Sequence, residues 1–257
     1  MYKTLHGLVL REVKYKESSK ILTILTEEEG KITAEARGAL RKGSKCSAAS
    51  QVLTWSDLTF FENRGRYTLT EGSVLEDFAA LRADLGDYAL GCYMAELLEA
   101  VSDEDSHSTA LLHLGLNALF ALSRQLYPAK HIKAVFELQA ACLAGYLPDV
   151  SGCGVCGCQD AGYFCVRQGM LRCKGCLRPG DGLCLPVSAG TLAALRYICQ
   201  ADPRRAFGFQ ASDAVLRQLS GLAETYLTVQ LEHSFSTLDF YHSICWNRSK
   251  ALAKNSF

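Results

Sequence analysis

The chain has 257 residues, of which 49% are hydrophobic and 21% charged, and its formal net charge is zero. This composition is typical of an ordinary soluble globular protein with one large core or two modest ones. Neutrality argues against a purely electrostatic DNA binder, so a nucleic-acid surface requires local clusters of Lys and Arg. No segment has the apolar run of a membrane span, and the first residues lack the apolar core of a signal peptide. We therefore expect a cytoplasmic protein with no membrane partner.

Short strands are predicted throughout residues 1–80. Apolar and polar residues alternate in them, and polar, glycine-containing turns separate them. Gly30 supplies the positive φ that a tight hairpin needs. About five such strands suit a five-stranded OB-fold barrel, a fold that commonly binds single-stranded nucleic acid. The predicted strands include Leu8–Leu10, Ile21–Thr26, Ile32–Ala36, Leu53–Phe61 and Tyr67–Glu71.

From Asp84 onward the apolar residues recur with the period of a helix. Leu90, Met94, Leu97 and Val101 fall on one helical face, and similar patterns follow near Leu112. Further helices are predicted around residues 132–143, from the N-cap Ser188, and from about Ser212. The sequence thus predicts an α+β protein in which residues 81–257 form a helical domain. A cysteine-rich module at about 150–185 interrupts it.

Four cysteines in this module have the spacing of a structural zinc site. Cys153 and Cys156 form one Cys-x-x-Cys pair, Cys173 and Cys176 form a second, and sixteen residues separate the pairs. Because cytosolic thiols stay reduced, we expect these clustered cysteines to be metal ligands rather than disulfides. Four thiolates complete a tetrahedral shell, which leaves no position for water or substrate. The predicted Zn²⁺ therefore stabilises the fold, as in a zinc ribbon.

The ligand assignment has alternatives. Cys158 and Cys165 lie close enough in sequence to replace a predicted ligand, and Cys184 follows a few residues downstream. The one-residue gap between Cys156 and Cys158 is poor geometry for two ligands of one ion, which favours the two Cys-x-x-Cys pairs. Free structural thiols or an iron–sulfur cluster are the other interpretations, and paired knuckles on a hairpin favour zinc over the cluster.

Basic residues gather in three places in the predicted barrel. A glycine- and serine-containing loop has four positive charges and no negative one, and such a loop suits contact with phosphates. A solvated surface loop is the alternative of about equal weight. The other clusters lie between the first two strands and at a later turn. The candidate DNA-binding residues are Arg11, Lys14, Lys16, Lys20, Arg37, Arg41, Lys42, Lys45, Arg64 and Arg66.

Motifs of common enzyme classes are missing from the sequence. It contains no Gly-x-x-x-x-Gly-Lys-Ser/Thr loop for a nucleotide and no dinucleotide-binding Gly-x-Gly-x-x-Gly fingerprint. No His-x-Glu precedes a Cys-x-x-Cys, so the zinc-deaminase signature is absent as well. We therefore predict a binding protein and not an enzyme.

The order of these motifs resembles the RecO family of bacterial recombination mediators, over nearly the whole chain. The N-terminal resemblance rests on Gly7-Leu8-Val9-Leu10, Glu17-x-x-Lys20-Ile21-Leu22, Gly30-Lys31-Ile32 and Ala36-Arg37-Gly38-Ala39 before the basic loop. Later, Phe136-Glu137-Leu138 leads to Gly145-Tyr146-Leu147-Pro148 and then to the two cysteine pairs. The zinc spacing directly after Gly-Tyr-x-Pro is the most distinctive part.

The resemblance implies an N-terminal OB fold and a helical domain that carries the zinc module. It also implies binding of single- and double-stranded DNA and annealing of complementary strands. Partners implied are the RecR protein, the RecA recombinase that is loaded, and the acidic C-terminal tail of single-strand-binding protein. The expected location is the cytoplasm of a bacterium, in association with the nucleoid. Two alternatives are a sequence-specific zinc-ribbon regulator and a zinc-dependent hydrolase or nuclease.

Overall fold

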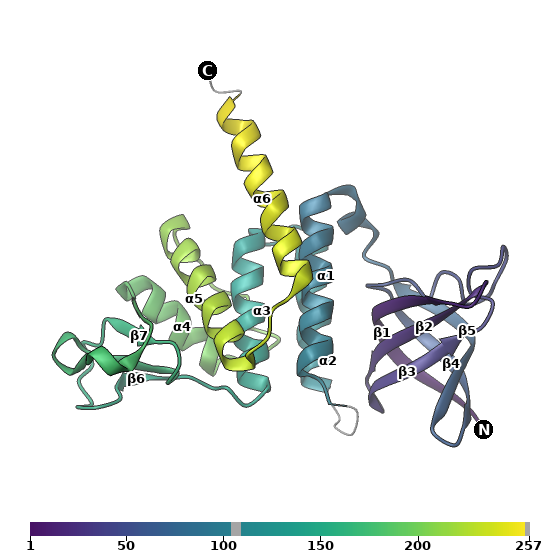
Figure 1. The fold of residues 1–257 in the computed structure, drawn as a ribbon, viewed down its shortest axis with the longest axis horizontal. Coiled ribbons are helices and arrows are strands. Elements are labelled where there is room, and N and C mark those ends of the chain that lie inside the picture. Colours follow the sequence, from purple (N-terminus) through teal and green to yellow (C-terminus); the bar gives the residue numbers. More distant parts are fainter. Residues whose placement is uncertain (104–108, 255–257) are drawn as a thin grey trace. The chain divides into compact units, whose positions relative to one another are not determined.

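The structure, a computed structural model, describes residues 1–103 and 109–254 (Figure 1), and only the backbone of residues 249 and 251–254. Contacts within the chain group it into two compact units. The first consists of Met1–Arg124 together with Phe235–Phe257, and the second is Gln125–Ser234. The expected division between residues 80 and 81 follows the sequence segments instead of these contacts, and it stays a prediction.

Five strands of the first unit close into a barrel (Figure 1). Around the barrel the order is β1-β2-β3-β5-β4, and β4 pairs again with β1. Neighbouring strands are antiparallel except β3 and β5, which run parallel. This arrangement confirms the predicted five-stranded OB fold. The strands are β1 (Tyr2–Tyr15), β2 (Ser19–Thr26), β3 (Gly30–Ala36), β4 (Trp55–Asn63) and β5 (Arg66–Glu76).

The barrel closes because alternate residues of its strands are apolar and point inward. In β4, for example, Leu58 and Phe60 are fully buried, whereas Phe61 is exposed. The segment after β3 contributes Ala39, Cys46 and Ala49 to the same interior, so part of the basic loop is packed against the core. The buried cluster contains Leu5, Val9, Leu22, Ile24, Ile32, Ala34, Ala36, Ala39, Cys46, Ala49, Leu58, Phe60 and Leu69.

Two hairpin turns place basic residues in left-handed backbone conformations. Gly30 ends the β2–β3 turn with φ 67°, as predicted. Lys16 in the β1–β2 turn has φ 54°, and Arg64 in the β4–β5 turn has φ 51°. Residues other than glycine are uncommon in the left-handed region of backbone conformation, and those that adopt it tend to mark functional positions. The two turns therefore hold Lys16 and Arg64 at fixed places on the barrel.

Three helices complete the first unit, together with the short 3₁₀ helix η1 (Ala79–Ala83). Asp84 caps the first of them, because its carboxylate accepts hydrogen bonds from the N–H groups of Gly86 and Asp87. Tyr93 packs edge-to-face on Phe235, just before the last helix. That last helix was not predicted from the sequence. The helices are α1 (Leu85–Val101), α2 (Thr109–Ser123) and α6 (Ser236–Lys254).

The second unit contains three helices and a small sheet. Ser188 and Ser212 cap α4 and α5 by accepting N–H hydrogen bonds, which confirms both predicted helix starts. The sheet has the order β6-β8-β7-β9, and the β7–β8 hairpin turns at Gly169. No helix among the described residues is long and apolar enough to span a membrane. The elements are α3 (Ala129–Leu143), β6 (Asp149–Cys153), β7 (Tyr163–Cys165), β8 (Met170–Arg172), η2 (Lys174–Cys176), η3 (Pro179–Asp181), β9 (Cys184–Pro186), α4 (Ala189–Gln200) and α5 (Asp213–Leu231).

Candidate metal centre and candidate nucleic-acid surface

The two predicted cysteine pairs come together in the second unit. The Sγ atoms of Cys153, Cys156, Cys173 and Cys176 all lie within 4.8 Å of one another. Cys153 ends β6 and Cys173 follows β8, and these two strands are hydrogen-bonded neighbours. The N–H of Gly154 donates to the carbonyl of Leu171 over 2.9 Å, which joins the two knuckles directly.

The donor set fits a tetrahedral metal ion. The Sγ atoms of Cys156 and Cys173 are 3.8 Å apart, and four sulfurs at ~2.3 Å from zinc have edges of about 3.8 Å. Backbone N–H groups, first that of Cys156 and then that of Cys173, donate to the Cys153 sulfur and lower the pKa of this thiol to about 6. A thiolate is the form that binds a metal, so Cys153 is prepared for binding, whereas its hydrogen bond to Cys173 raises the pKa of the Cys176 thiol to about 12.

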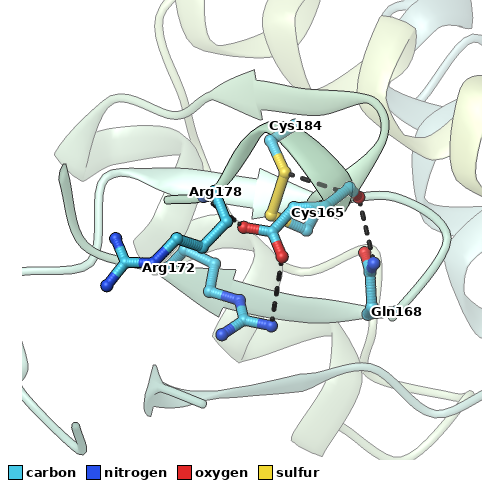
Figure 2. The surroundings of a disulfide bond; sticks show 6 residues. Cys165, Gln168, Arg172, Arg178 and Cys184 are labelled. Atoms are coloured by element: carbon cyan, nitrogen blue, oxygen red, sulfur yellow. Dashed lines mark hydrogen bonds and ion pairs between the residues drawn. A yellow bond between two sulfur atoms is a disulfide. The ribbon is translucent and has the colours of Figure 1, made fainter. Parts of the chain in front are cut away.

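Two further cysteines of the module form a disulfide (Figure 2). Cys165 on β7 lies opposite Cys184 on β9 in an antiparallel pair, and their sulfurs are bonded at 2.08 Å. The expectation that the clustered cysteines are ligands rather than disulfides is therefore wrong for this pair. Adjacent positions on paired strands bring the two Sγ atoms together, and the sequence spacing does not reveal this. In the disulfide state neither sulfur competes for the metal centre.

A buried carboxylate lies beside this disulfide (Figure 2). The Asp181 carboxylate accepts a 2.7 Å hydrogen bond from the N–H of Arg178 and forms an ion pair of 3.5 Å with the Arg172 guanidinium. The carbonyl of the same residue accepts from the Gln168 amide over 3.0 Å. These contacts fix the turn that follows the second knuckle, so Cys173 and Cys176 are held from both ends of their segment.

Cys158, the remaining alternative ligand, lies outside the group of four sulfurs that are mutually close. Its thiol donates to the carbonyl of Asp160 at 3.6 Å, while its own carbonyl accepts from the N–H of Cys153. The Cys158 thiol also hydrogen-bonds to the sulfurs of Cys156 and Cys173, and these contacts raise its pKa, so Cys158 borders the group of four sulfurs without belonging to it.

Three of the predicted basic residues surround one open hollow on the barrel. Lys16 comes from the β1–β2 turn, and Arg37 and Arg41 come from the segment that follows β3. The hollow has a volume of about 680 Å³, and Arg41 donates from Nε to the hydroxyl of Ser18 at 3.3 Å. Two serines, Ser18 and Ser19, and two acidic residues, Glu17 and Glu35, also line it. The serines were not singled out in the sequence, although they directly follow a basic cluster.

The barrel holds two other predicted residues by strong local contacts. Lys20 is buried, and its ammonium group donates to Glu12 at 2.7 Å and to the Ser50 carbonyl at 3.3 Å. Arg11 donates from Nε to both carboxylate oxygens of Glu99 on α1, at 2.9 and 3.0 Å. The structure does not bring these two side chains to the hollow.

The other predicted residues are exposed. Arg37 pairs with Glu35 at 3.1 Å, and Lys45 pairs with Glu71 at 3.5 Å. Lys14, Lys42, Arg64 and Arg66 have no ion-pair partner within the described ranges 1–103 and 109–254. The last two flank the β4–β5 turn. The candidate surface therefore contains exposed cations at three turns, and acidic side chains partly neutralise it.

Comparison with known proteins gives a consistent result along the chain. A family model described as "Recombination protein O N terminal" matches residues 1–78, and "Recombination protein O C terminal" matches residues 82–239. A DNA repair protein RecO of Acetivibrio thermocellus is 33% identical over 240 residues, which cover 93% of this chain and 95% of that protein. The RecO of Symbiobacterium thermophilum is 28% identical over 243 residues, covering 93% and 96%. Since these matches span both units, the chain belongs to the RecO family of DNA repair proteins.

Proposed function

We propose that this protein is a recombination mediator without catalytic activity. It binds single- and double-stranded DNA through its barrel, anneals complementary strands, and acts with RecR to load RecA onto single strands coated with single-strand-binding protein. The observation that carries the proposal is the hollow on the barrel, where two separate segments bring Lys16, Arg37 and Arg41 together. Glu17 and Glu35 also line this depression, and the three cations outnumber these two carboxylates, so a net positive charge remains to face a phosphate backbone.

Strand annealing needs charge screening rather than bond chemistry. Two DNA strands repel each other, and Lys or Arg side chains on a surface reduce that repulsion when they replace condensed counterions. The ion pairs of Arg37 and Lys45 are exposed, so each contributes little to stability and can exchange its carboxylate for a phosphate. Buried Lys20 instead supports the barrel beneath this surface, and the exposed Arg11 is engaged by Glu99 of α1.

The remaining candidates extend the same surface along the barrel. Lys14 and Lys16 belong to the β1–β2 region, and Arg64 and Arg66 flank the β4–β5 turn. In OB folds these two loops commonly border the nucleic-acid site. We therefore propose residues 1–80 as the DNA-binding domain, with Lys42 and Lys45 adding contacts from the loop after β3.

Residues 81–257 are proposed as the helical domain that carries the cysteine module. Family resemblance supports RecR and the acidic tail of single-strand-binding protein as partners, and a bacterial cytoplasm with nucleoid association as the location. Zn²⁺ on Cys153, Cys156, Cys173 and Cys176 supplies structural cross-linking when bound. These thiolates hold the knuckles in place, and no proposed step of annealing passes through the metal.

Two other functions make different predictions. A sequence-specific zinc-ribbon regulator would bind one DNA sequence far more tightly than others, by ~10³-fold or more. A zinc nuclease would need an open metal position and would cut DNA. Four thiolate ligands leave no such position, and the cations on the barrel face phosphates that every sequence presents. Both considerations support the mediator.

The test uses two complementary oligonucleotides coated with the cognate single-strand-binding protein, without nucleotide. Wild type is compared with a triple variant, Lys16→Gln, Arg37→Gln and Arg41→Gln. A matched control, Arg167→Gln, Arg204→Gln and Arg205→Gln, removes three exposed charges from the second unit. We expect the barrel variant to anneal more slowly, and its salt slope for single strands to fall by about two, since each phosphate contact contributes ~0.7.

The outcomes separate the parts of the proposal. If the barrel variant and the control anneal like wild type, the role stands but the hollow is not the DNA site. If folded, metal-loaded wild type neither binds nor anneals DNA, the mediator function is wrong. A strong dependence on base sequence would favour the regulator.

A further inference from the structure

Two aromatic side chains stand exposed next to each other on the outer surface of the barrel. Tyr2 on β1 is 68% exposed and Phe61 on β4 is 41% exposed. Their ring centroids are 5.4 Å apart in an edge-to-face arrangement, with an interplanar angle of 61°. Phe60, the preceding residue, is fully buried and packs on Tyr67 inside the barrel. The core therefore uses Phe60, and the neighbouring ring of Phe61 serves no purpose in the interior.

The strands hold this aromatic pair in a fixed position. Tyr2 lies directly opposite Phe61 in the β1–β4 ladder, and Phe61 lies opposite Thr68 in the β4–β5 ladder. Phe61 thus belongs to a central strand of a three-strand surface, where both neighbours restrain its backbone. An aromatic pair on paired strands loses little conformational entropy when a ligand stacks on it.

Two arginines lie near the end of β4 that carries Phe61. Arg66 on β5 lies opposite Asn63 on β4. Asn63 is two residues from Phe61 along β4, so the side chains of Arg66 and Phe61 lie on the same face of the sheet. Arg64 occupies the β4–β5 turn. Both arginines are exposed, and neither has an ion pair with any residue in the described part of the chain. An exposed aromatic surface bordered by unpaired guanidinium groups matches an anionic ligand with flat apolar rings.

We propose that Tyr2 and Phe61 form a base-stacking platform for single-stranded DNA, with Arg64 and Arg66 binding the adjoining phosphates. The inference rests on the proposed DNA-binding function and adds the discrimination between single strands and duplex. Bases in a duplex already stack on each other and expose only their edges, whereas unpaired bases present their faces to aromatic side chains. The hollow around Lys16 binds phosphates of either form, and the aromatic pair binds single strands alone.

The experiment replaces the rings while apolar bulk is kept. In the variant with Tyr2→Leu and Phe61→Leu, affinity for a single-stranded oligonucleotide is expected to fall by about tenfold or more, because the unpaired bases lose the aromatic rings on which they stack. Affinity for a duplex of the same length should stay within about twofold, and the salt slope should not change, since no phosphate contact is lost. Phe61→Tyr keeps a ring and should retain wild-type affinity.

Controls separate stacking from general damage. Leu75→Ala removes another exposed apolar side chain of β5, and it should leave binding to both DNA forms intact. Thermal unfolding of each variant checks that the barrel is folded. Ultraviolet cross-linking should join a single-stranded oligonucleotide to the peptide that contains Phe61 in wild type, and this product should be lost in the leucine variant.

Each outcome decides the proposal. Wild-type affinity of the folded leucine variant for single strands overturns the platform and leaves the proposed function intact. Equal losses for single strands and duplex also overturn it, since they indicate a general phosphate surface. If the variant binds DNA normally but loses its binding to single-strand-binding protein, the aromatic pair is a protein-docking surface and the proposal is wrong. Failure of wild type to bind any DNA would instead refute the proposed function itself.

Discussion

The barrel and the second unit use their polar side chains in opposite ways. In the barrel the interior is apolar, and Lys20 is the one charged residue buried among the described residues of β1–β5. In the second unit Lys133 and Glu137 of α3 are 2% and 0% exposed. The Lys133 ammonium group donates to Glu137 at 2.7 Å and to Glu224 of α5 at 2.6 Å. A disulfide and a cluster of four cysteines that could hold a metal ion add to these internal contacts.

This difference predicts whether a substitution should change ligand binding or stability. A charge on the barrel surface is weakly engaged and is available to a ligand, so its loss should change binding more than stability. A polar group inside the second unit has been removed from water. Its loss leaves the buried group that it contacted without a hydrogen bond or ion pair to offset the cost of desolvation. The same chemical change is therefore expected to have different consequences in the two units.

Metal removal should have the largest effect, and it should be confined to the second unit. Cys173→Ser or chelation is expected to remove about 10 kcal/mol of folding free energy from the module at residues 149–186, because binding of a structural metal by four thiolates contributes a free energy of this size to folding. Hydrogen exchange should become fast in the module and stay slow in β1–β5. Metal content is measured by mass spectrometry, and Cys158→Ser is the matched control.

Equal metal loss in Cys158→Ser would show that the ligand set is wrong. Loss of exchange protection in the barrel would contradict the independence of the two units that the comparison requires.

The buried ion pairs of α3 come next. Lys133→Met should destabilise the second unit by ~3–5 kcal/mol, because it leaves the carboxylate of Glu137 buried without its cation. Lys16→Met, the same substitution on the barrel surface, should change stability by less than about 0.5 kcal/mol. Urea unfolding measures both variants. Adding Glu137→Leu to Lys133→Met should recover part of the loss, and failure to do so would mean that packing, and not charge, dominates at this site.

Reduction of the Cys165–Cys184 disulfide should have an intermediate effect. The bond closes a segment that contains both cysteines of the second knuckle, Cys173 and Cys176, with a sequence separation of 19. Closing a loop of this size raises the free energy of unfolding by ~3 kcal/mol, because it restricts the conformations of the unfolded chain. A reductant, or serine at both positions, should therefore speed metal transfer to a chelator. The reductant should have no further effect on the serine variant, and unchanged transfer rates would refute this coupling.

Regular patterns were sufficient to predict much of this fold. Alternation along β1–β5 predicted the barrel because one face of each strand is buried, and the Cys-x-x-Cys spacing predicted which four sulfurs meet. Helix α6 was missed because few of its described side chains, such as Leu238 and Ile244, are buried. Its pattern is too weak to distinguish it from a polar tail.

Contacts between distant segments could not be predicted. Lys16 and Lys20 look alike in the sequence, yet Lys20 is buried because the carbonyl of Ser50, thirty residues later, covers its ammonium group. Cys165 and Cys184 meet through the pairing of β7 with β9, which no local spacing specifies. The candidate site was thus predictable as a set of residue types, and its division into surface and support required the fold.

The smallest expected effect is a pH dependence of the barrel, at His6. Its Nδ1 donates to Glu28 at 2.6 Å and its Nε2 lies 3.2 Å from Asp57, so the hydrogen bond to Glu28, followed by the charges of both carboxylates, raises the pKa of His6 above its usual value of 6.5. The pair therefore stabilises the barrel fully below pH 6.5, and this stabilisation is lost as the pH rises through the raised pKa. Because the side chain is 47% exposed, the change should not exceed about 1 kcal/mol. Urea unfolding of wild type and His6→Gln at several pH values should show this decrease in the free energy of unfolding with rising pH in wild type alone. An increase with rising pH would mean that the carboxylates do not control the pKa of His6.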